Sequence, residues 1–267
     1  MPFTVSHVAA VLPGYRALSR ARLFTAAVIG SMAPDFGMLL PGFVARWQTH
    51  SLLALFSFSL PMGLAAYGLT LLLIKPAVIE IVPDGAYARL RAADAMAAPR
   101  HLRAWLYAAL AILLGAITHL IWDAFTHENA RGVRMFPVLD EYGPGLHGHT
   151  PTLYHLLQYG SSVVGLMVVI GALVLWLRHA PAAPQRPQRR LRRGERFCWA
   201  SLYFVLPLLG IALATWHVLA PSQAALPTGM KLESIAVAGM RASAVSLVFV
   251  SLLLRARLAL VRQAPPS

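Results

Sequence analysis

The sequence has little cysteine and little charge, and each shortage excludes a class of protein. Its 267 residues include one cysteine, Cys198, so the chain cannot hold an internal disulfide or a metal site built on several thiolates. Only 12% of the residues are charged, against about 25% in soluble domains, which leaves too little polar surface to cover a soluble globule. In their place 58% of the residues are hydrophobic, which excludes a disordered chain and indicates a membrane protein.

Five segments are long and apolar enough to cross a membrane as helices, which takes about 20 residues. They lie approximately at residues 51–74, 104–126, 159–177, 197–219 and 235–254. A sixth segment, residues 23–40, is shorter and is interrupted by Ala33-Pro34-Asp35. We interpret it as a re-entrant helix, with a full span as the alternative. The sequence therefore predicts an all-α, polytopic helical membrane bundle with five or six spans.

Basic residues outnumber acidic residues by 23 to 10, and they gather in three segments outside the predicted spans. Residues 178–196 hold seven arginines and three prolines, and residues 75–103 and the C-terminal tail are also basic. Loops rich in lysine and arginine remain on the cytoplasmic side, so we expect all three segments there. The loop at residues 127–158 then lies on the outer side. The basic surface predicts contact with membrane lipids and no nucleic-acid partner.

The same composition divides the chain into three parts. Residues 1–180 form a membrane domain that carries the candidate site, residues 181–196 form an Arg/Pro-rich cytoplasmic loop, and residues 197–267 form two transmembrane helices and a basic tail. We expect a multi-pass protein, and the sequence does not fix its oligomeric state.

Three residues with ligand chemistry recur at every fourth position of the second predicted span: His119, Asp123 and His127. On an α-helix this spacing puts all three on one face. Ionisable groups inside a membrane segment are costly and usually functional, and histidine with carboxylate binds Zn²⁺ or Mn²⁺. The two histidines lie about 12 Å apart along the axis, so a single ion would use one adjacent pair. Two ions that share Asp123 are the alternative.

Further polar residues precede this span. His50 opens the first predicted span, and Asp35 follows Pro34, so both fall near the outer boundary. A re-entrant helix lets His7 reach them, whereas a full span leaves it on the cytoplasmic side. The presence of each of these residues, taken alone, is explained by a structural hydrogen bond or, for Asp35, by a helix cap. Together with the three residues of the second span, they predict a metal or catalytic site.

Other polar residues are weaker candidates. His147 and His149 lie in a turn-rich segment that is more typical of a solvent-facing loop. The sequence contains no phosphate-binding loop, nucleophile elbow or dinucleotide fingerprint. A polar cluster leads into the third predicted span, and hydrogen bonds between helices explain it better than contact with a substrate. Its members are Tyr154, Gln158, Ser161 and Ser162.

Several motifs, in order, resemble those of the DUF4184 family of uncharacterised bacterial membrane proteins. They are MPFTVSH at 1–7, IGSMAPDF at 29–36, THS at 49–51, HLIWDAFTH at 119–127 and YHLLQYGSS at 154–162. The resemblance runs from residue 1 to about 180. More distantly, the pattern is similar to inner-membrane proteins regarded as metal-dependent hydrolases and to zinc-dependent phospholipases C. The resemblance implies a bacterial inner-membrane protein and a metal-assisted hydrolase that uses His7, Asp35, His50, His119 and Asp123.

Together these observations predict a divalent metal, Zn or Mn, bound near the outer boundary of the membrane. Direct ligands are expected from His50, His119 and Asp123. Further ligands or a general base are expected from His7 and Asp35. A ligand of a second ion, or a residue that orients the first ligands, is expected from His127.

The predicted function is hydrolysis of a lipid-linked or phosphate-containing substrate. One alternative is a transporter or channel that uses a His/Asp relay. Another is a non-enzymatic scaffold that binds a partner through its arginine-rich loop. The third, fourth and fifth predicted spans contain no acidic residue, which favours the hydrolase over the relay.

Overall fold

The structure is a computed structural model that describes residues 4–40, 46–92, 101–143, 150–182, 190–220 and 228–263. Within these ranges the regular elements are helices, beside one isolated bridge between Tyr142 and Thr152. Five helices are long and apolar enough to cross a membrane: Leu52–Ile81, Leu102–Thr126, Leu153–His179, Arg193–Leu219 and Met230–Leu260. Each overlaps one of the five predicted spans, so the predicted all-α membrane architecture is confirmed.

The sixth predicted segment is too short to be one of these spans. It forms α2 (Phe24–Met32), which continues directly into the 3₁₀ helix η2 (Ala33–Leu39). Pro34 lies in the first turn of η2, where its missing N–H costs no hydrogen bond. The hydrocarbon core of a membrane is about 30 Å thick, so this helix favours the re-entrant interpretation over a full span.

The first long helix departs from α-helical geometry at two places, each just before a proline. The π-helical turns η3 (Leu55–Ser59) and η4 (Thr70–Ile74) precede Pro61 and Pro76. Proline lacks an N–H and its ring clashes with the carbonyl group four residues earlier. A wider turn relieves this clash without breaking the helix. The helix therefore continues through α6 (Lys75–Ile81), beyond the predicted end of the span at residue 74.

The chain forms two compact units, residues 1–67 with 99–176 and residues 68–98 with 177–267. All six candidate metal ligands belong to the first unit. The helices that carry or surround them are η1 (Thr4–Gly14), α2, η2, α3 (Arg46–Thr49), α8 (Leu102–Thr126), α9 (Arg131–Met135) and α10 (Leu153–His179).

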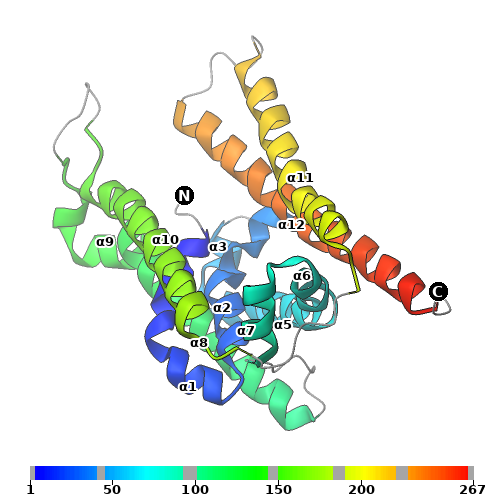
Figure 1. Cartoon of the computed structure of the whole chain (residues 1–267). Coiled ribbons are helices and arrows are strands. Elements are labelled where there is room, and N and C mark those ends of the chain that lie inside the picture. Colours follow the sequence, from blue (N-terminus) through cyan, green and yellow to red (C-terminus); the bar gives the residue numbers. More distant parts are fainter. Residues whose placement is uncertain are drawn as a thin grey trace. The chain divides into compact units, whose positions relative to one another are not determined.

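In the first unit α2 lies against α8, and two glycines make this contact unusually close (Figure 1). A Cβ atom on Gly30 would collide with the backbone carbonyl of Ile112, and one on Gly115 would collide with the carbonyl of Ala27. Small residues of this kind let membrane helices touch through their backbones. The contact brings the backbone of Ser31 to the side chain of His119.

We expect Gly115→Val to lower the thermal unfolding midpoint and to separate α2 from α8. The added side chain meets rigid backbone, so the cost should reach the upper part of the roughly 1–3 kcal/mol typical of overpacking. Differential scanning fluorimetry of the detergent-purified protein measures the change. Gly171→Val on α10 is the control, because a Cβ atom there meets nothing within 4 Å. Equal midpoints for the two variants would contradict the close contact.

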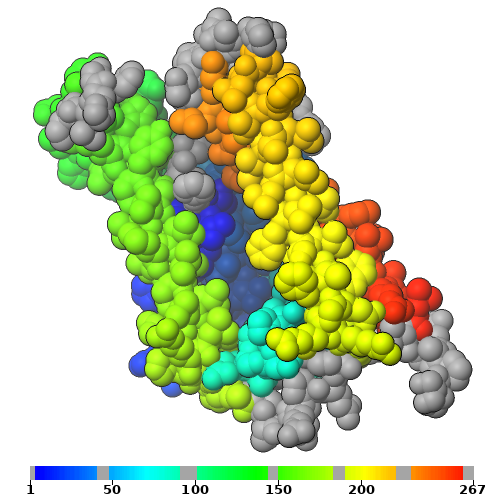
Figure 2. Space-filling model, turned by 45° about the horizontal axis from the view of Figure 1, so that its top comes forward, coloured from blue at the N-terminus to red at the C-terminus, as the bar shows by residue number. Residues whose placement is uncertain are grey.

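Helix α10, drawn in light green in Figure 2, exposes aliphatic side chains over its central part. Val163, Val164, Met167 and Ile170 each have about half of their surface exposed. Exposed aliphatic side chains on a helix of spanning length are expected to contact lipid. Only the N-terminal part of α10 buries polar side chains, and one of them, Gln158, contacts His127 of the cluster.

In the second unit α11 (Arg193–Leu219) lies along α12 (Thr228–Gln263). Figure 1 shows the two helices as a hairpin. Tyr203 and Ser251 form a hydrogen bond of 2.9 Å across the pair. Among the described residues of this unit, no group of histidine, cysteine and acidic side chains is close enough to share an ion.

Candidate metal centre

The structure brings the six candidate ligands together in one cluster of the first unit. Asp123 lies at its centre, with contacts to four histidines between 3.4 and 3.6 Å. The most deeply buried members are His119, with no exposed surface, and His7, with 2%. Both carboxylate residues, Asp35 and Asp123, are 5% exposed. The cluster thus contains two acidic groups that are almost completely removed from solvent.

Helix α8 supplies two of these residues because its polar face points inward. His119 and Asp123 are one turn apart and both buried, whereas Leu114, Ile117 and Ile121 on the other face are 38–60% exposed. This pattern suits a helix surrounded by lipid, where apolar side chains face outward and ionisable groups face the protein interior.

The N-terminal helix η1 closes the cluster. Thr4 donates a hydrogen bond of 2.8 Å from its hydroxyl to Oδ2 of Asp35, which joins η1 to η2. The ring of His7 stacks on the ring of His119, with 3.8 Å between ring centroids. Gly165 of α10 leaves room for the backbone of Ser6, so η1 also lies close to α10. These contacts place His7 over the cluster.

Four donor atoms form a group around one side of Asp123. Nε2 of His50 lies 3.3 Å from Oδ1 of Asp35 and 3.5 Å from Oδ2 of Asp123. Nε2 of His119 lies 3.6 Å from the same Asp35 oxygen and 3.4 Å from the same Asp123 oxygen. These distances exceed the 2.7–3.2 Å of ordinary hydrogen bonds. Two ligands of a tetrahedral zinc ion are about 3.3–3.4 Å apart, given metal–ligand bonds near 2.0–2.1 Å. Each of these four contacts thus has the spacing of two ligands on one ion, and three of the residues, Asp35, His50 and His119, each offer a donor atom within 4.8 Å of the other two.

Backbone and hydroxyl contacts orient the rings in this group. Nδ1 of His119 lies 2.8 Å from the carbonyl oxygen of Ser31, which can only accept, so Nδ1 donates. In the neutral ring the lone pair then lies on Nε2, which has no hydrogen-bond partner among the described residues and faces two carboxylate oxygens. This arrangement requires a positive charge, either a proton on the ring or a bound cation. The hydroxyl of Thr49 lies 2.7 Å from Nδ1 of His50 and orients this ring, either as donor or as acceptor.

The other oxygen of Asp123 faces two more histidines. Oδ1 lies 3.6 Å from Nε2 of His7 and 3.5 Å from Nδ1 of His127. The side-chain nitrogen of Gln158 lies 2.9 Å from Nε2 of His127. With that amide donating, the proton of His127 lies on Nδ1 and points toward Asp123. Nδ1 of His127 also lies 3.2 Å from the hydroxyl of Thr126. Both predicted roles of His127, ligand of a second ion or residue that orients the first ligands, stay predictions.

His7 is neutral under ordinary conditions. Burial, and next the neighbouring His119, lower the pKa of His7 to about 4. Neither nitrogen of its ring has a hydrogen-bond partner within the described residues. A buried polar atom without a partner is costly, and a neutral imidazole nitrogen is a good ligand for a cation. His7 therefore has the chemistry of a neutral ligand, while its lowered pKa makes it a weak proton acceptor.

Two overlapping sets of residues can hold a divalent ion. One consists of Asp35, His50 and His119, and the other of His7, His119 and Asp123; within each set the donor atoms lie within 4.8 Å of one another. Imidazole and carboxylate together suit Zn²⁺ or Mn²⁺, whereas Mg²⁺ and Ca²⁺ prefer oxygen ligands alone.

The supporting residues were harder to find in the sequence. Thr4, Ser31 and Thr49 all lie in the motifs given above, but no spacing in the sequence indicates which ligand each of them contacts. The predicted hydrogen bonding between helices is confirmed for Gln158 with His127 and for Ser161, which accepts from the Trp122 indole at 3.1 Å. His147 and His149 lie outside the described residues.

The fold and the cluster together define a helical membrane protein with a buried His/Asp site that can hold a divalent ion. A family model described as a domain of unknown function, DUF4184, matches residues 1–254. The chain therefore belongs to the DUF4184 family. The match extends beyond the motifs of the first 180 residues and includes most of the two C-terminal helices. Neither a curated protein nor a solved structure matches the chain.

Proposed function

We propose that this protein is a metal-dependent membrane hydrolase that acts on a lipid-linked or phosphate-containing substrate at the outer face of the bacterial inner membrane. The observation that carries the proposal is the unpartnered, fully buried Nε2 of His119 between the carboxylates of Asp35 and Asp123. A group of this kind is stabilised by a cation, and Zn²⁺ or Mn²⁺ fits its ligand types.

The residues of the cluster have distinct roles in this proposal. Asp35, His50, His119 and Asp123 would hold the ion, as members of the two overlapping sets. A bound divalent ion supplies a water of lowered pKa and polarises a phosphoryl or carbonyl oxygen. His7 is neutral and its ring nitrogens have no hydrogen-bond partner among the described residues, so it can serve as a further ligand of the ion. Ser31, Thr4 and Thr49 keep the side chains of the ligands in place.

A relay for protons or metal ions is the second candidate function. An unbroken series of contacts from His127 through Asp123 to His119 and Asp35 favours it. Two features support the hydrolase instead. The histidine and acidic residues of α8 lie only in its last turns, and the three spans that follow carry no acidic residue in their apolar segments. A relay needs such groups at mid-membrane in several spans.

The experiment compares hydrolysis and transport in the same preparation. Full-length protein is reconstituted into liposomes, and release of product is measured from a panel of phosphate-ester and acyl-ester lipids with Zn²⁺, with Mn²⁺ and with chelator. We expect hydrolysis that depends on metal and is lost in His50→Gln, with His101→Gln as the control because His101 is exposed and distant from the cluster. Flux of protons or Zn²⁺ without hydrolysis would support the relay and contradict the hydrolase.

The topology makes a separate prediction. In a background in which Cys198 is replaced by serine, Asn129→Cys should react with an impermeant maleimide in intact cells, because the loop after α8 is expected to be outside. Gln188→Cys should react only after permeabilisation, because the arginine-rich loop is expected in the cytoplasm. Gln188 lies outside the described residues. Labelling of Gln188→Cys in intact cells would reverse the topology and move the proposed site to the cytoplasmic face.

A further inference from the structure

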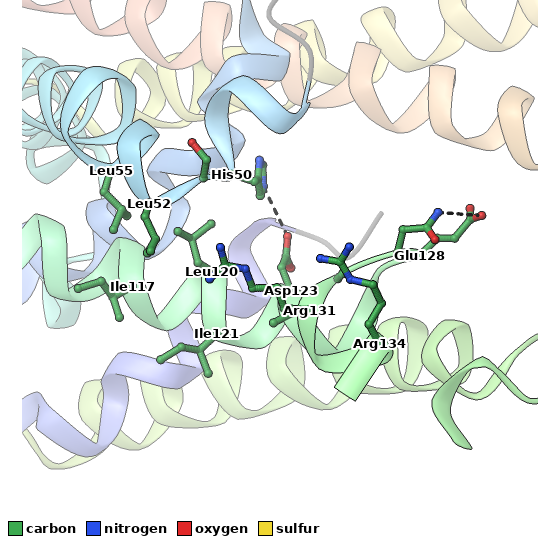
Figure 3. A pocket seen from close by; sticks show the side chains of 14 residues that line it. His50, Leu52, Leu55, Ile117, Leu120, Ile121, Asp123, Glu128, Arg131 and Arg134 are labelled. Atoms are coloured by element: carbon green, nitrogen blue, oxygen red, sulfur yellow. Dashed lines mark hydrogen bonds and ion pairs between the residues drawn. The ribbon is translucent and has the colours of Figure 1, made fainter. Parts of the chain in front are cut away.

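A cavity of about 600 Å³ opens beside the His/Asp cluster, within the first unit. One part of its wall is apolar and comes from the two facing helices, with Leu52 and Leu55 on one side and Ile117, Leu120 and Ile121 on the other. Figure 3 shows these side chains at one end of the cavity and His50 with Asp123 farther along it. The cavity thus joins an aliphatic wall to the donor atoms of the cluster.

The aliphatic wall continues onto the surface that is expected to face lipid. Leu52 is 64% exposed and Ile121 is 58% exposed, and both lie on helices of spanning length. A hydrocarbon chain could therefore enter from the side, between the two helices, without crossing water. A water-soluble substrate would gain nothing from this part of the wall.

The opposite end of the cavity is lined by charged side chains of both signs. Arg131 and Arg134 of α9 both line it, and Figure 3 shows their side chains next to Asp123. Both side chains are exposed, and neither forms an ion pair within the described part of the chain. Glu128 also lines this end, where it accepts a hydrogen bond from Asn129. Two guanidinium groups beside a cation site suit a phosphate better than any neutral headgroup.

We propose that this cavity binds a membrane phospholipid with an anionic headgroup, with an acyl chain along Leu52, Ile117 and Ile121 and the phosphate between Arg131, Arg134 and the metal cluster. This inference rests on the proposed function and narrows its substrate class. The apolar wall selects a lipid over a soluble phosphate ester. The arginine pair selects a lipid with a net negative charge over a zwitterionic one.

The test measures binding, so that it does not depend on turnover. Full-length protein in phosphatidylcholine nanodiscs with Zn²⁺ is exposed to phosphatidylglycerol that carries a photoreactive diazirine in one acyl chain, and crosslinked peptides are mapped. We expect crosslinks at residues 52–55 and 117–124 that excess phosphatidylglycerol prevents. Glycerol phosphate at the same concentration should not prevent them.

Variants test the charged end of the cavity. The double variant Arg131→Gln with Arg134→Gln should bind phosphatidylglycerol about tenfold more weakly, because two charge-assisted hydrogen bonds are lost. Arg16→Gln with Arg103→Gln is the matched control: it also removes two exposed arginines of the first unit, but neither of them lines the cavity. Unchanged binding in the arginine-pair variant, or equal competition by glycerol phosphate, would overturn the inference.

Binding and hydrolysis can fail independently. Specific crosslinking without any metal-dependent hydrolysis would support the lipid site and contradict the proposed enzyme. Metal-dependent hydrolysis of soluble phosphate esters, without specific crosslinking, would support the enzyme and overturn the lipid site.

Discussion

Asp123→Asn should remove most of the bound metal and leave the fold intact. Asparagine keeps the size of aspartate, so α8 should form as before. It lacks the negative charge that faces His50 and His119 through Oδ2 and His7 through Oδ1. Loss of a direct ligand at the centre of the cluster should weaken metal affinity by more than the 10–100-fold that is typical of residues that only support ligands. Metal analysis by mass spectrometry of detergent-purified protein measures the effect.

Two controls accompany this substitution. Asp140→Asn makes the same chemical change at an exposed position, and His101→Gln removes an exposed histidine. Both should retain the metal content of the unchanged protein. If Asp123 were only a structural partner of His119, asparagine could still accept a hydrogen bond and the metal content would not change. Equal metal content in all four proteins would lead us to abandon the hydrolase assignment.

Chelation should destabilise the protein, and this effect requires no knowledge of the substrate. Without an ion, the nearly buried carboxylates of Asp35 and Asp123 repel each other and face the lone pair of His119. An ion present at 100 times its dissociation constant stabilises the folded state by about 2.7 kcal/mol. For a chain of this size that corresponds to a shift of roughly 5–10 °C in the unfolding midpoint. Fluorimetric melting curves with EDTA and after addition of Zn²⁺ or Mn²⁺ measure the shift.

The same melting curves contain an internal check. Asp123→Asn should melt at one temperature with and without chelator, since it holds little metal to lose. A midpoint of the unchanged protein that does not respond to EDTA or to added Zn²⁺ and Mn²⁺ would contradict a metal role for the cluster. It would instead favour protonated histidines as the partners of the two carboxylates.

Local sequence patterns were sufficient for the membrane architecture. Hydrophobic runs of spanning length predicted the five long helices, because a helix in lipid must satisfy its own backbone and cover it with apolar side chains. The i, i+4 spacing of His119 and Asp123 likewise determined that they share a face of α8. Neither inference needs contacts between distant segments. The proline effects on the first long helix were not anticipated, since π-helical turns adjust a helix without ending it.

The residues of the candidate site could also be predicted from the sequence, but their arrangement in space could not. Only the tertiary structure decides that Asp35 and His50 face His119 across 83 and 68 intervening residues, and that Asp123 directs one oxygen to each half of the cluster. It does so through contacts without a sequence signature, such as the backbone approach at Gly30 and Gly115 and the carbonyl of Ser31 beside His119. The physical reason is the distance along the sequence between the residues that interact. Hydrophobic periodicity depends on residues a few positions apart, whereas a metal site depends on the packing of helices that are far apart in the sequence.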